Sequence, residues 1–234
     1  MILGIDTSTA VINIGLIDNE KVIFDYTCKR KEPHCEELLL LLHENLKLHA
    51  VDIKQVKGVG ISIGPGSFTG LRTGLAFAKG LAVGLEVPLI GVPTLDAVVT
   101  TLIFEKNLES KENTLIIPVI LAVRGEFYYA VYRGEKLLTD YMADLPKDIA
   151  KTLEKFHAKK IIITGNALDY LKENSELNSC EFYNIYFPKG SIIAKLAGKN
   201  LINKRFNPKE IATLEPIYIH PPRIKQSKKF KIVD

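Results

Sequence analysis

An internal repeat limits the folds open to this chain more than anything else in its sequence. Residues 18–26 (DNEKVIFDY) align with residues 133–141 (RGEKLLTDY) at an offset of 115, and the Glu-Lys and Asp-Tyr pairs of the two segments coincide. At the same offset, residues 11–17 (VINIGLI) align with residues 126–132 (EFYYAVY). Similarity at a fixed long spacing indicates a duplicated structural unit. We therefore expect two lobes of one design, each opening with strands joined by a tight turn.

Each copy of these strands leads into a predicted helix and a further strand. The pattern predicts helices over about 35–48 and 149–156, followed by buried strands over 59–63 and 160–164. A βββαβα unit that occurs twice predicts two stacked α/β lobes with a cleft between them, as in the actin, sugar-kinase and Hsp70 (ASKHA) fold. Because residues 105–114 (EKNLESKENT) are polar and aperiodic, we place the N-terminal lobe at 1–105, the C-terminal lobe at 106–222 and a basic tail at 223–234.

Composition predicts a soluble, cytoplasmic protein. Hydrophobic residues make up 47% of the 234 residues and charged residues 25%, and three cysteines without CxxC spacing indicate a reduced compartment rather than disulfides or thiolate zinc. No segment reaches the ~18 apolar residues that a membrane helix needs. The last twelve residues hold five basic residues and one acidic residue, which accounts for the whole net charge of +4. The neutral body predicts no broad nucleic-acid face, and the tail is either a solvated terminus or a contact for a polyanion.

Two segments carry residues suited to phosphate chemistry. Residues 6–9 (DTST) follow the first predicted strand, and a glycine-rich loop at 64–70 (GPGSFTG) leads into a predicted helix over 68–85, whose N-terminus offers free N–H groups. The loop lacks the lysine of a Walker motif. At the repeat offset Asp6 falls on Leu121, which can neither bind a cation nor accept a proton. The candidate phosphate-facing residues, as possible vestiges of such chemistry, are Asp6, Thr7, Gly64, Gly66 and Ser67.

A purely structural role for the first of these segments is equally open, because Asp and Thr side chains often satisfy the backbone of their own turn.

The first two predicted helices have features of a docking surface. The helix over 68–85 carries small residues at a spacing of four, which favours close approach of another helix. The first helix has five consecutive leucines at 38–42, which span 400° and cannot all face one core. Packing of the small residues against the chain's own sheet is the alternative. The candidate partner-interface residues are Leu38, Leu39, Leu42, Gly70, Gly74, Phe77 and Ala78.

Several motifs together resemble the TsaB (YeaZ-like) family. They lie over most of the chain, at 2–9 (ILGIDTST), 34–38 (HCEEL), 64–82 (GPGSFTGLRTGLAFAKGLA), 92–96 (VPTLD), 124–128 (RGEFY) and 216–218 (PIY). The resemblance implies a subunit of the bacterial machinery that makes N6-threonylcarbamoyladenosine (t6A) in tRNA. It also implies that the chain is a paralogue of the catalytic subunit TsaD, binds TsaD through its first two helices, and works in an assembly with the ATPase TsaE.

The resemblance further implies that this chain is not the catalyst. TsaD-like proteins place an HxxxH metal pair after the small-residue helix and the next strand, and if Thr94 and Val98 occupy those positions no imidazole is left to bind a metal. Many TsaB-like proteins carry an acid where this chain has Leu121. We expect a non-catalytic scaffold without metal or cofactor, able to form a homodimer in isolation and contacting tRNA only indirectly or through the tail.

Two other hypotheses remain at this point. One is an ATPase or kinase of the actin-like fold that uses Asp6 and the Gly64 loop. The other is a metallopeptidase, which the missing histidine pair disfavours.

Overall fold

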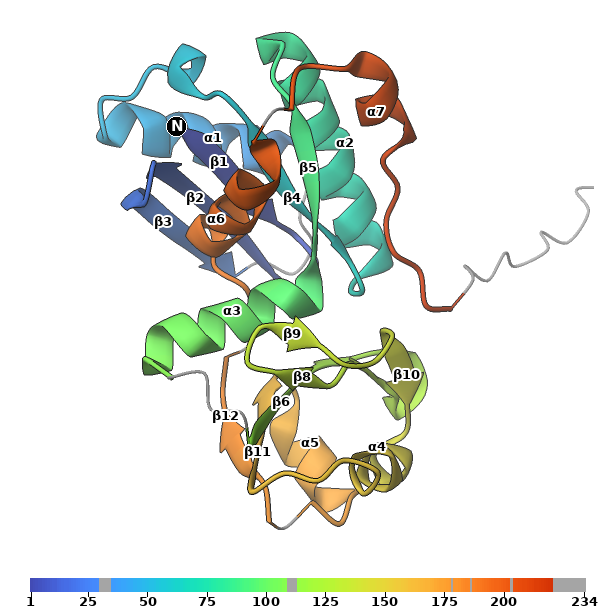
Figure 1. Cartoon of the computed structure of the whole chain (residues 1–234). Coiled ribbons are helices and arrows are strands. Elements are labelled where there is room, and N and C mark those ends of the chain that lie inside the picture. Colours follow the sequence, from blue (N-terminus) through green and yellow to red (C-terminus); the bar gives the residue numbers. More distant parts are fainter. Residues whose placement is uncertain (30–34, 109–112, 178, 186, 203, 221–234) are drawn as a thin grey trace, which may run out of the picture.

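The computed structural model describes residues 1–29, 35–108, 113–177, 179–185, 187–202 and 204–220. The chain forms two lobes, each built on one mixed sheet (Figure 1). The first sheet has the order β3-β2-β1-β4-β5 and the second β10-β7-β6-β11-β12, with β8 paired to both β6 and β9.

The elements of the first lobe are β1 (Ile2–Asp6), β2 (Val11–Asp18), β3 (Lys21–Lys29), α1 (Cys35–Leu48), a short 3-10 turn (Ile53–Gln55), β4 (Val59–Gly64), α2 (Phe68–Leu85) and β5 (Leu89–Pro93). Helix α3 (Thr94–Lys106) joins the lobes. The second lobe contains β6 (Thr114–Leu121), a 3-10 turn (Val123–Gly125), β7 (Phe127–Tyr129), β8 (Tyr132–Arg133), β9 (Lys136–Leu137), β10 (Met142–Asp144), α4 (Pro146–Leu153), β11 (Lys160–Gly165), α5 (Leu168–Glu173) and β12 (Glu181–Tyr183). Helices α6 (Gly190–Leu201) and α7 (Pro208–Thr213) follow.

The strand orders confirm the duplicated ASKHA fold. In each sheet the opening strand, β1 or β6, pairs antiparallel with the next strand and parallel with the strand after the first helix, β4 or β11. The predicted helix over 149–156 begins earlier, at Pro146, because proline is well suited to the first helical turn. The predicted strand over 126–132 is divided between β7 and β8.

The first sheet is covered on both faces because its side chains alternate. Leu3, Ile5 and Ile61 point to one face, where they pack with the leucines of α1 and the small residues of α2. The opposite face carries Gly4, Gly15 and Gly60, which lie side by side in register across β2, β1 and β4. Helix α6 packs on this face (Figure 1).

These three glycines allow the backbone of α6 to lie directly on the sheet. A Cβ atom at Gly4 would lie 2.1 Å from the Gly190 carbonyl oxygen, and one at Gly15 would lie 2.0 Å from the Ser191 nitrogen. No side chain larger than hydrogen fits beneath the first turns of the helix. The Asp25 carboxylate of β3 also holds the start of α6, accepting hydrogen bonds from the Ser191 N–H at 3.0 Å and from the Ser191 hydroxyl.

Helices α3 and α6 are exchanged between the lobes. Helix α3 follows the last strand of the first sheet, yet Leu95, Val99 and Leu102 pack in a core with Ile116 and Ile162 of the second sheet. Helix α6 follows the last strand of the second sheet and packs on the first. Each lobe thus completes its core with a helix that follows the other lobe's sheet in sequence.

This exchange differs from the predicted lobe boundaries. The boundary near 105–114 does separate the two sheets, but the predicted C-terminal lobe at 106–222 included α6 and α7, which pack on β1 and α2 of the first lobe. The sequence repeat could not indicate this, because it covers the strands and not the helices that cross between lobes. The tail at 223–234 lies outside the described residues.

We predict that Gly15→Ala destabilises the fold. Its new methyl group would meet the backbone of α6, and overpacking of this kind costs about 1–3 kcal/mol. Gly84→Ala is the control, because its Cβ would have nothing within 4 Å and alanine favours a helix over glycine by up to about 1 kcal/mol. Urea unfolding of both variants measures the difference. Equal stability of the two variants would contradict the close contact between α6 and the sheet.

Candidate functional site

The Asp6 turn is closed to solvent, and the side chains of Asp6, Thr7 and Ser8 are paired within the chain, whereas the buried Thr9 hydroxyl has no hydrogen-bond partner. The Asp6 carboxylate accepts hydrogen bonds from the Ser8 N–H at 3.1 Å, the Ser8 hydroxyl at 2.6 Å and the Asn13 amide at 3.1 Å. Thr7 is fully buried and its hydroxyl donates to the Gly70 carbonyl at 2.8 Å. Burial raises the pKa of Asp6 above its ordinary value, against the opposing effect of the hydrogen bonds it accepts.

The glycine-rich loop packs onto this turn rather than standing open beside it. A Cβ at Gly66 would lie 2.4 Å from the Ser8 carbonyl oxygen, and the Ser67 N–H donates to the same oxygen at 2.7 Å. The Gly64 N–H donates to the Thr94 hydroxyl at 3.1 Å, and the Ser67 hydroxyl caps α2 by accepting from the Gly70 N–H. The N–H groups of Gly64, Ser67 and Gly70 are therefore already used within the chain.

The candidate phosphate-facing residues are thus brought together, but in a different arrangement from the one expected. Thr7, Gly66 and Ser67 belong to contacts between loop and turn, whereas Asp6 is bonded to Ser8 and Asn13 and Gly64 is bonded to Thr94. The buried positions of Asp6 and Thr7 favour the structural alternative that the sequence left open. In the second lobe Leu121 ends β6 as Asp6 ends β1. The Leu121 N–H donates to the Asn166 side-chain oxygen at 2.6 Å, so this group is already used within the chain.

Thr94 and Val98, the residues expected at the positions of a metal-binding pair, are apolar or already paired. Thr94 and Val98 are both buried in α3, and the Thr94 hydroxyl is the acceptor for Gly64. Within the described part of the chain, no group of three or more His, Cys, Asp or Glu side chains is arranged to hold a metal ion. His34 lies outside the described residues.

The small-residue positions predicted for a partner are filled by this chain. Helix α2 packs with Gly70 against the Thr7 carbonyl and with Gly74 against the Thr7 hydroxyl, where a Cβ would lie 2.0 Å from the oxygen. Ala78 is also fully buried. These three residues face the interior, which corrects the expectation that they lie on an open surface. Gly70, Gly74 and Ala78 instead fit the alternative stated for the small residues, which is packing within this chain.

A second row of small residues lies on the outer side of the same helix. Ala76, Gly80 and Gly84 repeat at a spacing of four, all three are exposed, and a Cβ at Gly80 or Gly84 would have nothing within 4 Å. Phe77 is half-buried beside this row. The sequence contained this second row, since Gly80 and Gly84 are visible in it, but the period alone does not say which row faces outward.

The leucines of α1 divide between the core and the surface. Leu38 and Leu42 are buried, whereas Leu39 is 60% exposed and Leu40 is 56% exposed. The prediction that the run cannot face one core is confirmed by these two side chains, although Leu38 and Leu42 belong to the interior. Because α1 packs beside α2 in the same layer, the lobe presents two adjacent helices with apolar or small surface residues (Figure 1).

The lobe junction contains a cluster that the sequence did not point to. The Asp96 carboxylate, in the first turn of α3, accepts hydrogen bonds on one oxygen from the Tyr132 hydroxyl at 2.6 Å and the Tyr141 hydroxyl at 2.7 Å. Burial, followed by the effects of Asp96, raises the pKa of both phenols above the ordinary value. Both phenols therefore stay protonated and act as donors.

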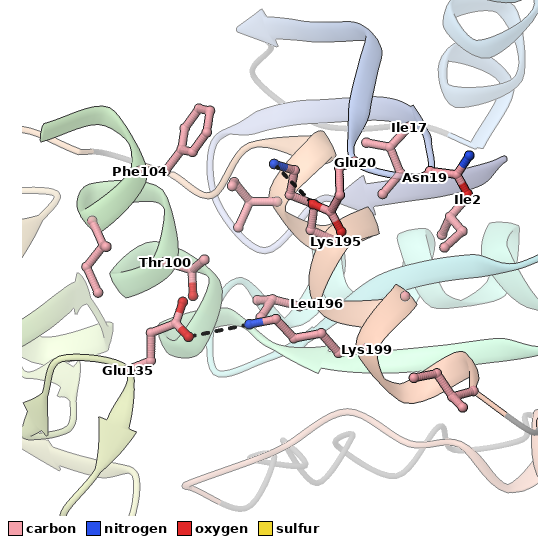
Figure 2. Close-up of a pocket in the computed structure, with 14 residues that line it drawn as sticks. Ile2, Ile17, Asn19, Glu20, Thr100, Phe104, Glu135, Lys195, Leu196 and Lys199 are labelled. Carbon is pink, nitrogen blue, oxygen red and sulfur yellow. Dashed lines mark hydrogen bonds and ion pairs between the residues drawn. The ribbon is translucent and has the colours of Figure 1, made fainter. Parts of the chain in front are cut away.

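Elsewhere along the junction there is a groove of about 580 Å³, shown in Figure 2. Glu20 and Glu135, which coincide in the sequence repeat, reach Lys195 and Lys199 on successive turns of α6 at 3.9 and 3.4 Å. The Lys195 ammonium also lies over the Phe104 ring, 4.9 Å from its centroid. Two acids and two bases balance each other there, so the groove carries no net charge from these four side chains.

Comparison with known proteins agrees with this architecture. The family model described as "TsaD: tRNA N6-adenosine threonylcarbamoyltransferase" matches residues 28–153, more than half of the chain. A Buchnera aphidicola (strain Bp) protein named tRNA threonylcarbamoyladenosine biosynthesis protein TsaB is 29% identical over 226 residues, covering 94% of this chain and 97% of that protein. The Escherichia coli K12 protein of the same name is 32% identical over 135 residues, covering 58% of this chain and 56% of its own length.

A solved structure shows the same fold. YeaZ from Pseudomonas aeruginosa superposes with a TM-score of 0.78 at 21% identity, covering 93% of this chain and 99% of that one. The duplicated sheets and the matched family model define a TsaD-related protein of the ASKHA fold. Within that class, the chain belongs to the TsaB (YeaZ-like) family, as its motifs indicated. No helix in the described ranges combines the length and apolar character needed to cross a membrane.

We predict that the buried Asp6 carboxyl makes stability depend on pH. Its pKa is raised in the folded state, so the stability that the neutral carboxyl provides is present below the unfolded-state value of about 3.9 and is lost as pH rises through the folded-state pKa. Asp6→Asn cannot titrate at this position. The free energy of unfolding of the wild type minus that of the variant should fall as the pH rises above the unfolded-state value of about 3.9. Urea unfolding across this range checks it, and a difference that rises with pH would contradict it.

Proposed function

We propose that this chain is a non-catalytic subunit of the bacterial tRNA t6A machinery that binds and supports a TsaD-like catalytic paralogue. The observation that carries the proposal is the pair of helices α1 and α2, which present exposed leucines beside an open row of small residues on a member of the TsaB family. A TsaE-like ATPase joins the larger assembly, and the chain contacts tRNA through its partner or through the tail at 223–234. In isolation the same surface pairs with a second copy of this chain.

The shape of this surface suits another helix. Axes of packed helices lie 8–10 Å apart, and the distance depends on the side chains between them. With hydrogen or methyl side chains at Ala76, Gly80 and Gly84, a partner helix can approach α2 closely. Leu39 and Leu40 on the neighbouring helix add apolar area, each worth roughly 1.5–3 kcal/mol when fully buried.

The chemistry of the cleft residues supports the assignment of catalysis to the partner. The Asp6 carboxylate is surrounded by donors from its own chain, and the matching strand end in the second lobe carries Leu121. If Thr94 and Val98 occupy the positions where TsaD-like proteins have histidines, they supply no imidazole there. The alternative, an ATPase or kinase that uses Asp6 and the Gly64 loop, requires this packed unit to open.

We predict that Gly80→Leu abolishes partner binding without unfolding the chain. Its side chain would enter open space in the monomer but would occupy the space of a closely packed partner helix. Leu39→Glu should act in the same direction by placing a charge in the contact. Both variants should lower the affinity for a TsaD-like protein at least tenfold in calorimetry, a change of about 1.4 kcal/mol.

Ile202→Glu is the matched control for these variants, because Ile202 is 75% exposed but lies at the end of α6, away from α1 and α2. Circular dichroism must show all three variants folded. Undiminished binding by both Gly80→Leu and Leu39→Glu would remove the proposed surface. Gly74→Leu is unsuitable for this purpose, because its side chain would collide with Thr7 in the chain's own interior.

We predict that the isolated chain neither hydrolyses ATP nor modifies tRNA. Added to a TsaD-like protein and a TsaE-like ATPase, it should restore formation of t6A, measured by mass spectrometry of tRNA nucleosides. Calorimetry with Mg-ATP provides a second test. Robust turnover by the chain alone, or tight Mg-ATP binding that Asp6→Ala removes, would support the ATPase alternative instead.

A further inference from the structure

The segment after α7 is fastened to the first lobe at the glycine-rich loop. We call residues 216–220 the C-terminal strap. The Ile217 N–H donates to the Ile63 carbonyl at 2.7 Å, and a Cβ at Gly64 would lie 2.8 Å from the Ile217 carbonyl oxygen. Gly64 also has a φ of 108°, so both its conformation and the close strap require glycine.

A side-chain cluster at the start of α2 adds to this attachment. The Arg72 guanidinium lies 4.0 Å from the centroid of the Phe68 ring and donates through Nε to the Tyr218 hydroxyl at 3.0 Å. The rings of Phe68 and Tyr218 lie 5.5 Å apart. Cation–π and hydrogen-bond contacts of this kind hold the strap along the first turn of the helix.

The end of the strap reaches the second lobe. The His220 Nε2 atom lies 3.0 Å from a Glu126 carboxylate oxygen, and the His220 ring lies 6.4 Å from that of Tyr128. Glu126 follows the 3-10 turn in which Arg124 has a φ of 65°, a conformation that a bulky residue adopts only when its surroundings impose it. Figure 1 shows the segment after α7 running from beside α2 towards the second lobe. The strap therefore crosses the lobe junction.

A second connection starts from the same loop. The Gly64 N–H is bonded to the Thr94 hydroxyl at the first position of α3, and two residues later Asp96 receives the hydroxyls of Tyr132 and Tyr141 from the second lobe. Hydrogen bonds from two partly buried phenols to one carboxylate are stronger than an exposed side-chain contact such as His220–Glu126. The loop at Gly64 is thus linked to the second lobe twice, through the strap and through the Asp96 cluster.

We propose that the C-terminal strap and the Asp96 cluster act together as a latch that holds the two lobes at one fixed angle. Two-lobed proteins commonly close around ligands by hinge motion, in which a few residues absorb the change. Here both links converge on the Gly64 loop, at the end of the sheet from which α2 begins. The latch converts a fold able to hinge into a rigid body.

The test measures the distance between the lobes in the full-length chain. Cys28, Cys35 and Cys180 are replaced by serine, and spin labels are attached to cysteines introduced at the exposed positions Lys54 and Lys155, one in each lobe. Pulsed electron paramagnetic resonance should give one narrow distance distribution. The double variant His220→Ala, Tyr141→Phe should give a broad or two-peaked distribution, and each single variant a smaller change.

Lys151→Ala is the control, because it removes an exposed ion pair with Asp148 inside the second lobe and should leave the distribution unchanged. A narrow, unshifted distribution in a folded double variant would overturn the proposal, as would a broad distribution in the wild type. If the double variant does not fold, Glu126→Ala decides, since it removes only an exposed contact: amide hydrogen exchange at Ile217 should rise at least several-fold, and unchanged exchange would equally overturn the latch.

Discussion

The first lobe depends on the direct contact between the backbone of α6 and the sheet beneath it. Gly4, Gly15 and Gly60 form a row across three strands, and only hydrogen atoms separate this row from the helix. A row of larger side chains would lift α6 by several ångströms and uncover β1, the central strand that carries Asp6 at its end. The geometry of the Asp6 turn, of the Gly64 loop beside it and of the α2 helix that follows all rest on this contact.

The same close packing explains why the loop and turn form a structural unit. Thr7 fills the space left by Gly70 and Gly74, and Ser8 supplies the oxygen that meets Gly66 and Ser67. Residues that in outline resemble a phosphate cradle have most of their hydrogen-bonding groups paired with other groups of the same chain. Buried polar groups in proteins are mostly paired, and in this turn Asp6, Thr7 and Ser8 find their partners inside the chain. In our proposal, function has moved from the cleft to the outer faces of α1 and α2.

Much of the fold could be predicted from the sequence, and the features of the candidate site that could not be predicted were missed for physical reasons. The repeat at an offset of 115 predicted the duplicated sheets. It also predicted that Leu121 holds the position in the second repeat that Asp6 holds in the first. The inward direction of Gly70 and Gly74 could not be predicted, because two rows of small residues on α2 share the same spacing and only the packing against Thr7 distinguishes them. The Asp96 cluster and the strap were also missed, since their partners are 36 to 154 residues apart and no local pattern reports such pairs.

The exchange of α3 and α6 has a consequence for synthesis of the chain. While the ribosome is still translating the second sheet, the first sheet has only one of its faces covered, because α6 is the helix that shields the other. The glycine-floored side of β1, β2 and β4 therefore stays open to water until residue 201 has left the exit tunnel. Neither half of the sequence contains all the helices that cover its own sheet. Pairings that span most of the polypeptide slow folding relative to local ones.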